Sequence, residues 1–184
     1  MIHRLARLNR CCLLVTLLAC SGTVKADLVS ESEAGKQTMS KFMINLAKFV
    51  TWPEAQFNAK SDPYRYCVMG NDPFRGVLED AVIERKVKQR SFKVKYLNIG
   101  DISAAKHCHV VFLNVNAASQ AVSIIRDLAS YPILTVGEVD LFAQNGGMVG
   151  FMGKGRKVAL AVNQKRLEAS GLKASSRLYR ASTM

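Results

Sequence analysis

The stretch YPILTVGEVDLFAQNGGMVGFMGKGRKVALAVN, residues 131–163, decides the fold class of this 184-residue chain. Ile133, Leu134 and Val136 follow Pro132 as a short apolar run rich in β-branched residues. Such a run is typical of a strand that is covered on both faces, as in a parallel sheet. Apolar and polar residues then mix over 138–144 in the way that a single helical turn requires.

The second half of this stretch predicts an antiparallel hairpin. Gly146 and Gly147 tolerate backbone angles that other residues resist, so the chain can reverse tightly there. Two segments of strand-like composition, 148–152 and 157–163, flank the tight-turn sequence Gly-Lys-Gly-Arg at 153–156. The whole stretch contains no nucleophile, metal-ligand set or phosphate-cradling loop, so it indicates architecture rather than chemistry.

The remainder of the chain alternates strands with helices. Apolar residues recur at steps of three and four over 36–50, which predicts an amphipathic helix lying on a core. Further strands are predicted at 64–70, 92–96 and 108–115, and further helices at 74–83, 101–106, 117–129, 164–170 and 174–181. This order predicts an α/β fold: a single mixed, largely parallel sheet with helices on both faces and a C-terminal antiparallel hairpin.

The first 26 residues have the pattern of a secretory signal peptide. A basic start precedes an apolar run at 11–20 that is too short to span a bilayer, and a small, polar region ends at Ala26. Cleavage before Asp27 is favoured; the alternative is a lipobox at 17–20, which would leave Cys20 as a lipidated N-terminus. Both cuts put residues 27–184, predicted as one domain with a flexible lead-in at 27–35, outside the cytoplasm, in the periplasm.

The charge of the chain is strongly basic. Removing the leader with its four basic residues and no acid lowers the formal net charge from +12 to +8. Lys93 and Lys95 alternate with apolar residues, which predicts a half-buried edge strand whose lysines deter edge-to-edge pairing. The alternative is a polyanion-binding surface over 86–95, because basic patches attract acidic partners and envelope polymers.

Two cysteines, Cys67 and Cys108, remain after cleavage before Asp27. In an oxidising compartment two cysteines indicate one disulfide, and two buried free thiols are the alternative. The predicted strands that carry them can be neighbours at the centre of a doubly wound sheet, within disulfide reach.

Candidate chemistry is sparse in the mature chain. His107 and His109 flank Cys108, but on a strand the two histidines would share one face and the cysteine the other. Neither a metal site nor a Cys–His nucleophile is therefore expected, and no catalytic acid–base set indicates an enzyme. No cofactor and no nucleic-acid partner are expected. Trp52, the single tryptophan, stands at a helix end before Pro53 and is more typical of a packing anchor than of a binding platform.

Several short motifs together resemble the YfiR family of periplasmic proteins. They are KFVTWP at 48–53, YCVMG at 66–70, CHVVFL at 108–113, PILTV at 132–136, GGMV at 146–149, VN at 162–163 and GLKASSRL at 171–178. Their order and spacing cover residues 36–180. Cys67 and Cys108 match the cysteine pair of the family, whereas a second pair found in some relatives is replaced by Ala143 and Gly150.

The resemblance implies a small periplasmic α/β protein that represses a membrane-anchored diguanylate cyclase of the YfiN type by binding its periplasmic portion. Release of such a repressor raises cyclic di-GMP and promotes biofilm formation, and members tend to form homodimers. A repressor needs an exposed apolar anchor patch. We expect it around Phe142, Met148 and Phe151, flanking the double glycine, with Trp52 as a weaker candidate. The alternative function is a periplasmic solute- or envelope-polymer-binding module.

Overall fold

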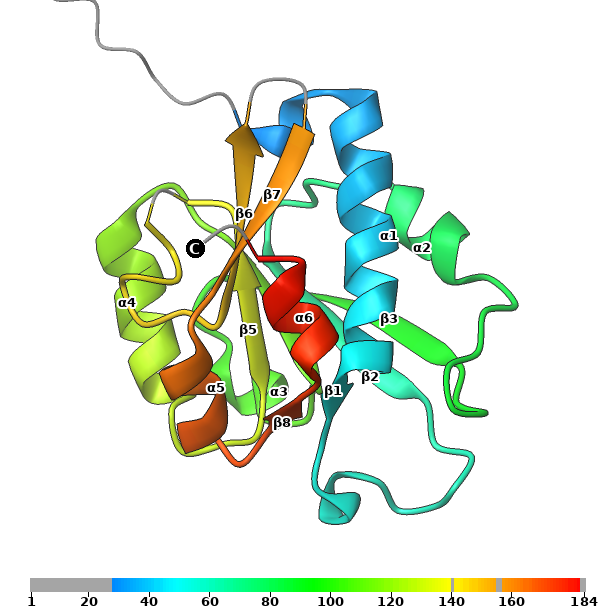
Figure 1. Ribbon diagram of the computed structural model, residues 1–184. Coiled ribbons are helices and arrows are strands. Elements are labelled where there is room, and N and C mark those ends of the chain that lie inside the picture. The colour runs from blue at the N-terminus through cyan, green and yellow to red at the C-terminus, as the bar shows by residue number, and fades with distance from the viewer. Residues whose placement is uncertain (1–27, 140, 155–156, 183–184) are drawn as a thin grey trace, which may run out of the picture.

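A six-stranded mixed sheet forms the centre of the computed structural model, which describes residues 28–139, 141–154 and 157–182 (Figure 1). The strand order is β3-β2-β4-β5-β6-β7, and every neighbouring pair is parallel except the antiparallel hairpin β6–β7. The strands are β2 (Tyr64–Gly70), β3 (Phe92–Leu97), β4 (Val110–Asn114), β5 (Leu134–Gly137), β6 (Val149–Lys154) and β7 (Lys157–Val162). A short pair, β1 (Val50–Thr51) with β8 (Lys173–Ala174), lies apart from this sheet.

Helices cover both faces of the sheet, as Figure 1 shows. One face carries α1 (Glu33–Phe49), α2 (Val77–Val82), α5 (Gln164–Ala169) and α6 (Ser176–Arg180), whose buried apolar residues join one core cluster. The opposite face carries α3 (Ile102–Ala105) and α4 (Ala118–Asp127), which join a second cluster. The predicted fold class is confirmed.

The central strands are buried on both faces, which explains their continuous apolar sequences. Tyr66 and Val68 of β2 pack toward α1, whereas Cys67 and Met69 pack toward α4. The Tyr66 hydroxyl donates to the carbonyl of Met43 in α1 at 2.9 Å, so a buried polar group on the sheet has its partner. By contrast, β3 lies at the sheet edge with exposed Lys93 and Lys95, which confirms the predicted edge strand.

The N-terminal part of the domain is more ordered than the sequence predicted. Residues Val29–Glu31 form a short 3-10 helix, η1, and Ser32 caps α1 by accepting a hydrogen bond from the Gly35 amide at 3.0 Å. A Cβ on Gly35 would lie 1.8 Å from the Val29 carbonyl oxygen, so glycine is needed for η1 to pack on α1. The expectation of a flexible lead-in is therefore wrong for residues 28–35, and residue 27 lies outside the described residues.

Three of the predicted helical segments differ in the structure. The helical turn predicted over 138–144 is absent from its described residues: Glu138 and Val139 are not helical and residues 141–146 form turns, because Leu141 has a left-handed φ of 56°. The helix predicted over 74–83 begins only at Val77, because Arg75 and Gly76 are left-handed. The segment predicted as a helix over 174–181 starts with β8 and is helical only over Ser176–Arg180. The predicted hairpin turn at 153–156 falls partly outside the described residues.

The disulfide between Cys67 and Cys108 is present and joins neighbouring strand segments. Its Cα atoms are 6.0 Å apart, and the two cysteines are 41 residues apart in the chain. Cys67 lies in β2 opposite Val111 of β4, and Cys108 precedes β4 by two residues. The bond thus fastens the two central parallel strands, whose pairing is nonlocal and costs loop entropy.

Removing this bond should weaken the fold without changing it. Replacing both cysteines by serine should lower the free energy of unfolding by roughly 3–4 kcal/mol on the chain-entropy estimate for such a loop. Urea unfolding of the double variant and of the oxidised protein measures the difference. Titration of native, purified protein should find no free thiol at Cys67 or Cys108, and two free thiols would contradict the bond.

Candidate functional site

A concave apolar surface of about 450 Å³ lies where the hairpin β6–β7 meets the loop after β5, and we call it the apolar hollow. Leu28 and Val29 of the N-terminal segment form one side of it, the loop after β5 a second and the hairpin a third. Its walls are formed by Leu28, Val29, Glu138, Val139, Leu141, Phe142, Ala143, Gln144, Gly150, Phe151, Met152, Gly153 and Ala161.

Phe142 is held in a slot made by two glycines. A Cβ on Gly137 would lie 2.5 Å from the Phe142 ring, and a Cβ on Gly147 would lie 2.2 Å from it. The Gly147 amide also donates to the Phe142 carbonyl at 2.9 Å. The double glycine therefore admits an aromatic ring into the core and does not push its neighbours outward.

The apolar side chains predicted to be exposed here are buried. Phe142, Met148 and Phe151 are each 2% exposed. Phe151 packs edge-on against Phe42 of α1 with ring centroids 6.1 Å apart, which places it between the sheet and α1. The expected exposure is wrong, although Phe142 and Phe151 do line the floor of the apolar hollow.

The apolar side chains that are exposed around the hollow are different ones, which the sequence analysis did not identify. Leu141 is 62% exposed, and Leu28 and Met152 are each 40% exposed. Leu141 holds its left-handed backbone without being glycine, asparagine or aspartate, a conformation that costs a bulky residue about 1–3 kcal/mol. A strained backbone that presents an apolar side chain to solvent is a feature that clusters at binding sites.

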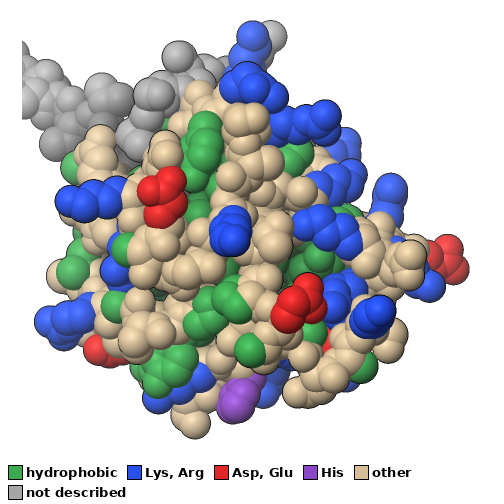
Figure 2. Space-filling view, turned by 60° about the horizontal axis from the view of Figure 1, so that its bottom comes forward, with side chains coloured by type: hydrophobic (Ala, Val, Ile, Leu, Met, Phe, Trp, Pro, Cys, Tyr) green, Lys and Arg blue, Asp and Glu red, His purple; other side chains and the backbone are tan. Residues whose placement is uncertain are grey.

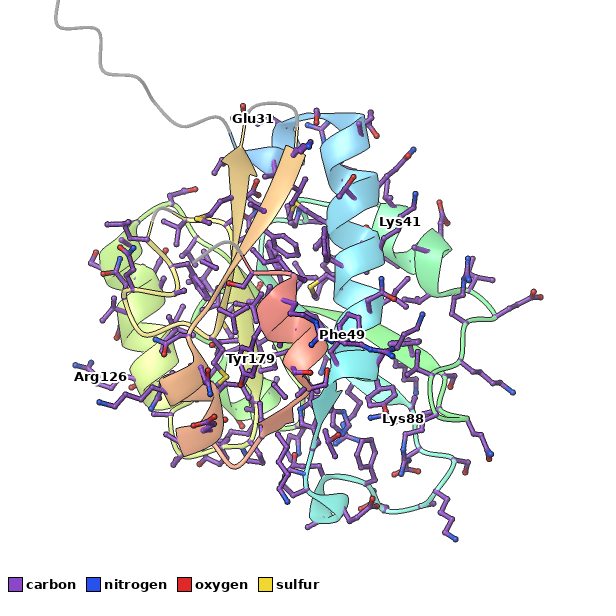
Figure 3. All side chains as sticks on the ribbon, in the orientation of Figure 1. Glu31, Lys41, Phe49, Lys88, Arg126 and Tyr179 are labelled. Carbon is purple, nitrogen blue, oxygen red and sulfur yellow. A yellow bond between two sulfur atoms is a disulfide. The ribbon has the colours of Figure 1, made fainter. Side chains whose placement is uncertain are left out.

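One polar contact fixes the N-terminal wall of the hollow. The Ser30 amide of η1 donates to the Glu138 carboxylate at 2.7 Å, and Glu138 is otherwise buried. Glu31 of η1 lies at the same end of the molecule as the tips of β6 and β7 (Figure 3). The wall formed by Leu28 and Val29 is thus attached to the loop that carries Leu141.

Trp52 lies at the other end of the domain and serves as a packing anchor. It is 4% exposed, and its indole N–H donates to the carbonyl of His109 at 2.9 Å. Its ring contacts Tyr64 and His109 with centroids 5.6 and 5.8 Å apart. Trp52 is therefore not part of the apolar hollow. The fold does not bring it together with the other predicted partner-binding residues around the double glycine.

The two histidines do not share a face, contrary to the sequence expectation. Residues 107–109 precede β4 and lack strand alternation. His107 is exposed beside Cys108, whereas His109 is fully buried and stacks on Phe57 with ring centroids 4.4 Å apart. Across the described residues, no group of three or more His, Cys, Asp or Glu side chains is placed to hold a metal ion.

His109 is neutral in the folded protein. Burial and the neighbouring Arg65 guanidinium lower the pKa of His109 from 6.5 to about 4. Its Nδ1 accepts a hydrogen bond from the Arg65 amide at 2.9 Å, so Nε2 carries the ring proton. That Nε2 is buried and has no hydrogen-bond partner among the described residues.

Comparison with known families identifies the chain. A family model described as YfiR/HmsC-like matches residues 36–183, so the protein belongs to the YfiR/HmsC-like family. This family consists of periplasmic regulatory proteins that act in the context of cyclic di-GMP signalling. A search of curated proteins finds no match. None of the helices in the described ranges is long and apolar enough to cross a membrane.

Leu141 provides a direct test of backbone strain at the apolar hollow. Leu141→Gly and Leu141→Ala both remove the exposed side chain, but only glycine relieves the left-handed φ. The glycine variant should therefore be more stable than the alanine variant by about 1 kcal/mol. Thermal and urea unfolding measure this difference, and equal stabilities would show that the backbone at this position is unstrained.

Burial of neutral His109 predicts a loss of stability in mild acid. Between pH 6.5 and about 4 the unfolded chain binds a proton at this residue and the folded chain does not. Stability therefore falls as the pH is lowered through this window, by at most about 1.4 kcal/mol per pH unit.

His109→Asn keeps an acceptor for the Arg65 amide and removes the titrating group. Urea unfolding at several pH values between 7 and 4 should show a shallower dependence in this variant than in the parent protein. Parallel curves for the two proteins would contradict the assignment of this pH dependence to His109.

Proposed function

We propose that this protein represses a membrane-anchored diguanylate cyclase by binding its periplasmic portion at the apolar hollow. Membership of the YfiR/HmsC-like family supports the signalling context. The observation that carries the choice of surface is the exposed, strained Leu141 at the rim of an apolar concavity. Leu141 is too exposed to contribute much to the core, so packing alone does not account for its strained conformation.

The chemistry of the hollow favours an apolar anchor on the partner. Phe142 and Phe151 give a fixed aromatic floor, while Leu141 and Met152 provide a rim that can adapt to the partner. Central, desolvated contacts of this kind carry most of the binding energy in protein interfaces. A volume of about 450 Å³ is enough to receive one or two large side chains.

The targeting segment sets where this contact would be made. We propose that residues 1–26 direct export and that the mature chain begins at Asp27, one residue before Leu28 of the hollow. A lipidated Cys20 is the alternative start, and it would attach the domain to a membrane through residues 21–27. Homodimer formation remains a prediction from the family.

A gene deletion and substitutions at two exposed positions test the proposal. Deleting the gene should raise cyclic di-GMP and surface attachment, and Met152→Glu should do the same while the protein accumulates folded. A glutamate there would be buried without a partner in the complex, which should weaken binding about tenfold or more.

Val122→Glu is the matched control, because Val122 of α4 is also 40% exposed but does not line the hollow. It should leave cyclic di-GMP at its normal level. Met148→Glu would be a poor test, since Met148 is buried and the charge would destabilise the fold itself. Unchanged cyclic di-GMP after deletion, in cells that normally express the protein, would refute the repressor function.

A second candidate function, periplasmic solute binding, is favoured by a separate pocket around Trp52. That pocket combines buried aromatic rings with basic side chains.

A further inference from the structure

A pocket of about 380 Å³ lies between the loop after β1 and the turn before β3, and we call it the Trp52–Arg90 pocket. It is lined by Thr51, Trp52, Glu54, Phe57, Lys60, Tyr64, Lys88, Gln89 and Arg90. It shares no lining residue with the apolar hollow. In Figure 3 Glu31 of η1 is labelled at the top of the molecule and Lys88 of this pocket in its lower part. The Trp52–Arg90 pocket is therefore distinct from the apolar hollow.

Arg90 supplies a buried positive charge without an acidic partner. It is 9% exposed, its Nη1 donates to the carbonyls of Ala59 and Asp62 at 2.8 and 3.0 Å, and its guanidinium lies 3.7 Å over the Phe57 ring. Within the described part of the chain, no carboxylate oxygen lies within 4.0 Å of this guanidinium. Its Nε and Nη2 make no hydrogen bond to described residues, so they remain available to a ligand.

Tyr64 supplies a hydroxyl donor that a ligand in the pocket can reach. The residue is 3% exposed and lines the pocket, yet its hydroxyl makes no hydrogen bond to any described residue. Burial raises the pKa of Tyr64, so the hydroxyl stays protonated and can donate. A bound anion would accept a hydrogen bond from this hydroxyl in place of solvent.

A tight turn brings Lys88 to the same pocket. Val87 and Arg90 exchange both backbone hydrogen bonds, at 2.9 and 3.0 Å, around Lys88 and Gln89, which have left-handed φ values of 50° and 66°. Hairpin turns of this kind favour asparagine and glycine at those two positions. The Lys88 Nζ has only long contacts, 3.5 Å to the Val50 carbonyl and 3.4 Å to the Thr51 hydroxyl.

We propose that the Trp52–Arg90 pocket binds a small oxyanion, a phosphate or carboxylate group, between Tyr64, Lys88 and Arg90. A guanidinium fork and a hydroxyl donor match the acceptor oxygens of such a group. Trp52 and Phe57 provide apolar walls that strengthen these contacts by excluding water. Glu54, the single acid that lines the pocket, is exposed at its edge.

The wider surface agrees with an anionic ligand. On the face that Figure 2 shows, Lys and Arg side chains are spread widely and Asp and Glu side chains are few. Such a field draws anions toward the protein, while the donors of the pocket select a site. The proposal does not depend on the cyclase partner or on the apolar hollow.

Trp52 gives a built-in reporter, because it is the single tryptophan of the chain and lines the pocket. Titration of the full mature protein with inorganic phosphate and, separately, with glucuronate should change its fluorescence saturably. The two probes distinguish a phosphate ligand from a carboxylate ligand, and glucose is the uncharged control. Absence of a saturable change with both anions, confirmed by calorimetry, would overturn the proposal.

Three conservative variants locate the effect. Tyr64→Phe keeps the ring and removes only the hydroxyl, and Lys88→Gln removes one charge from an exposed side chain. Each should weaken binding about tenfold, the loss expected for one hydrogen bond to a charged group. Lys86→Gln is the matched control, since Lys86 is exposed two residues away and does not line the pocket. An equal loss with Lys86→Gln would show general charge attraction and overturn the proposed site.

Discussion

Hydrogen bonds that converge on His109 hold together the segments on which the rest of the domain depends. Its amide donates to the Arg65 carbonyl at 2.8 Å, and its Nδ1 accepts from the Arg65 amide at 2.9 Å, which fixes β2 beside β4. Its carbonyl accepts from the Leu134 amide of β5 and from the Trp52 indole, both at 2.9 Å. One buried residue thus sets the register of three parallel strands and seats the loop after β1. The neighbouring Cys67–Cys108 bond fastens the same two strands covalently, so both constraints act where nonlocal pairing is most costly.

The sequence specified the layers well because each rests on a strong periodic pattern. The apolar run of β5 predicted a strand buried on two faces, and the stripe on α1 predicted a helix on a core. Local exceptions could not be predicted, because they arise from tertiary contacts. Leu141 adopts a left-handed backbone that no propensity favours, and Arg75 does the same before α2. Residues 107–109 escape strand alternation because they lie just before β4 and are fixed by the disulfide and by the His109 contacts.

At the candidate site, too, the sequence pattern predicted part of the arrangement and tertiary packing determined the rest. Two of the residues that the sequence singled out around the double glycine, Phe142 and Phe151, line the apolar hollow. The sequence predicted exposure for the wrong side chains, because a glycine pair is compatible with two arrangements. It can leave the neighbouring side chains exposed, or it can make room for an aromatic ring to pack against the backbone. Here Gly137, distant from Gly147 in the chain, completes the slot for Phe142, and only the packed structure reveals that pairing. The exposed groups, Leu141 and Met152, carry no sequence signal that separates them from core residues.

The two sites differ in the forces they offer to a partner. The apolar hollow acts through burial of Leu141, Met152 and the aromatic floor, and salt at moderate concentration screens none of these contacts. The Trp52–Arg90 pocket acts through Arg90, Lys88 and the Tyr64 hydroxyl, and the exposed part of its charge is screened over about 8–10 Å at physiological ionic strength.

These sites are also held by different parts of the fold. The floor of the apolar hollow is fixed by β5, β6 and the glycine slot, whereas the walls of the Trp52–Arg90 pocket are fixed by β1, β2 and the turn before β3. A ligand can couple to a distant partner only if it binds two states of the protein with different affinity. The two sites share no lining residue. An oxyanion in the pocket would therefore bind alongside a protein on the hollow, each through its own local chemistry.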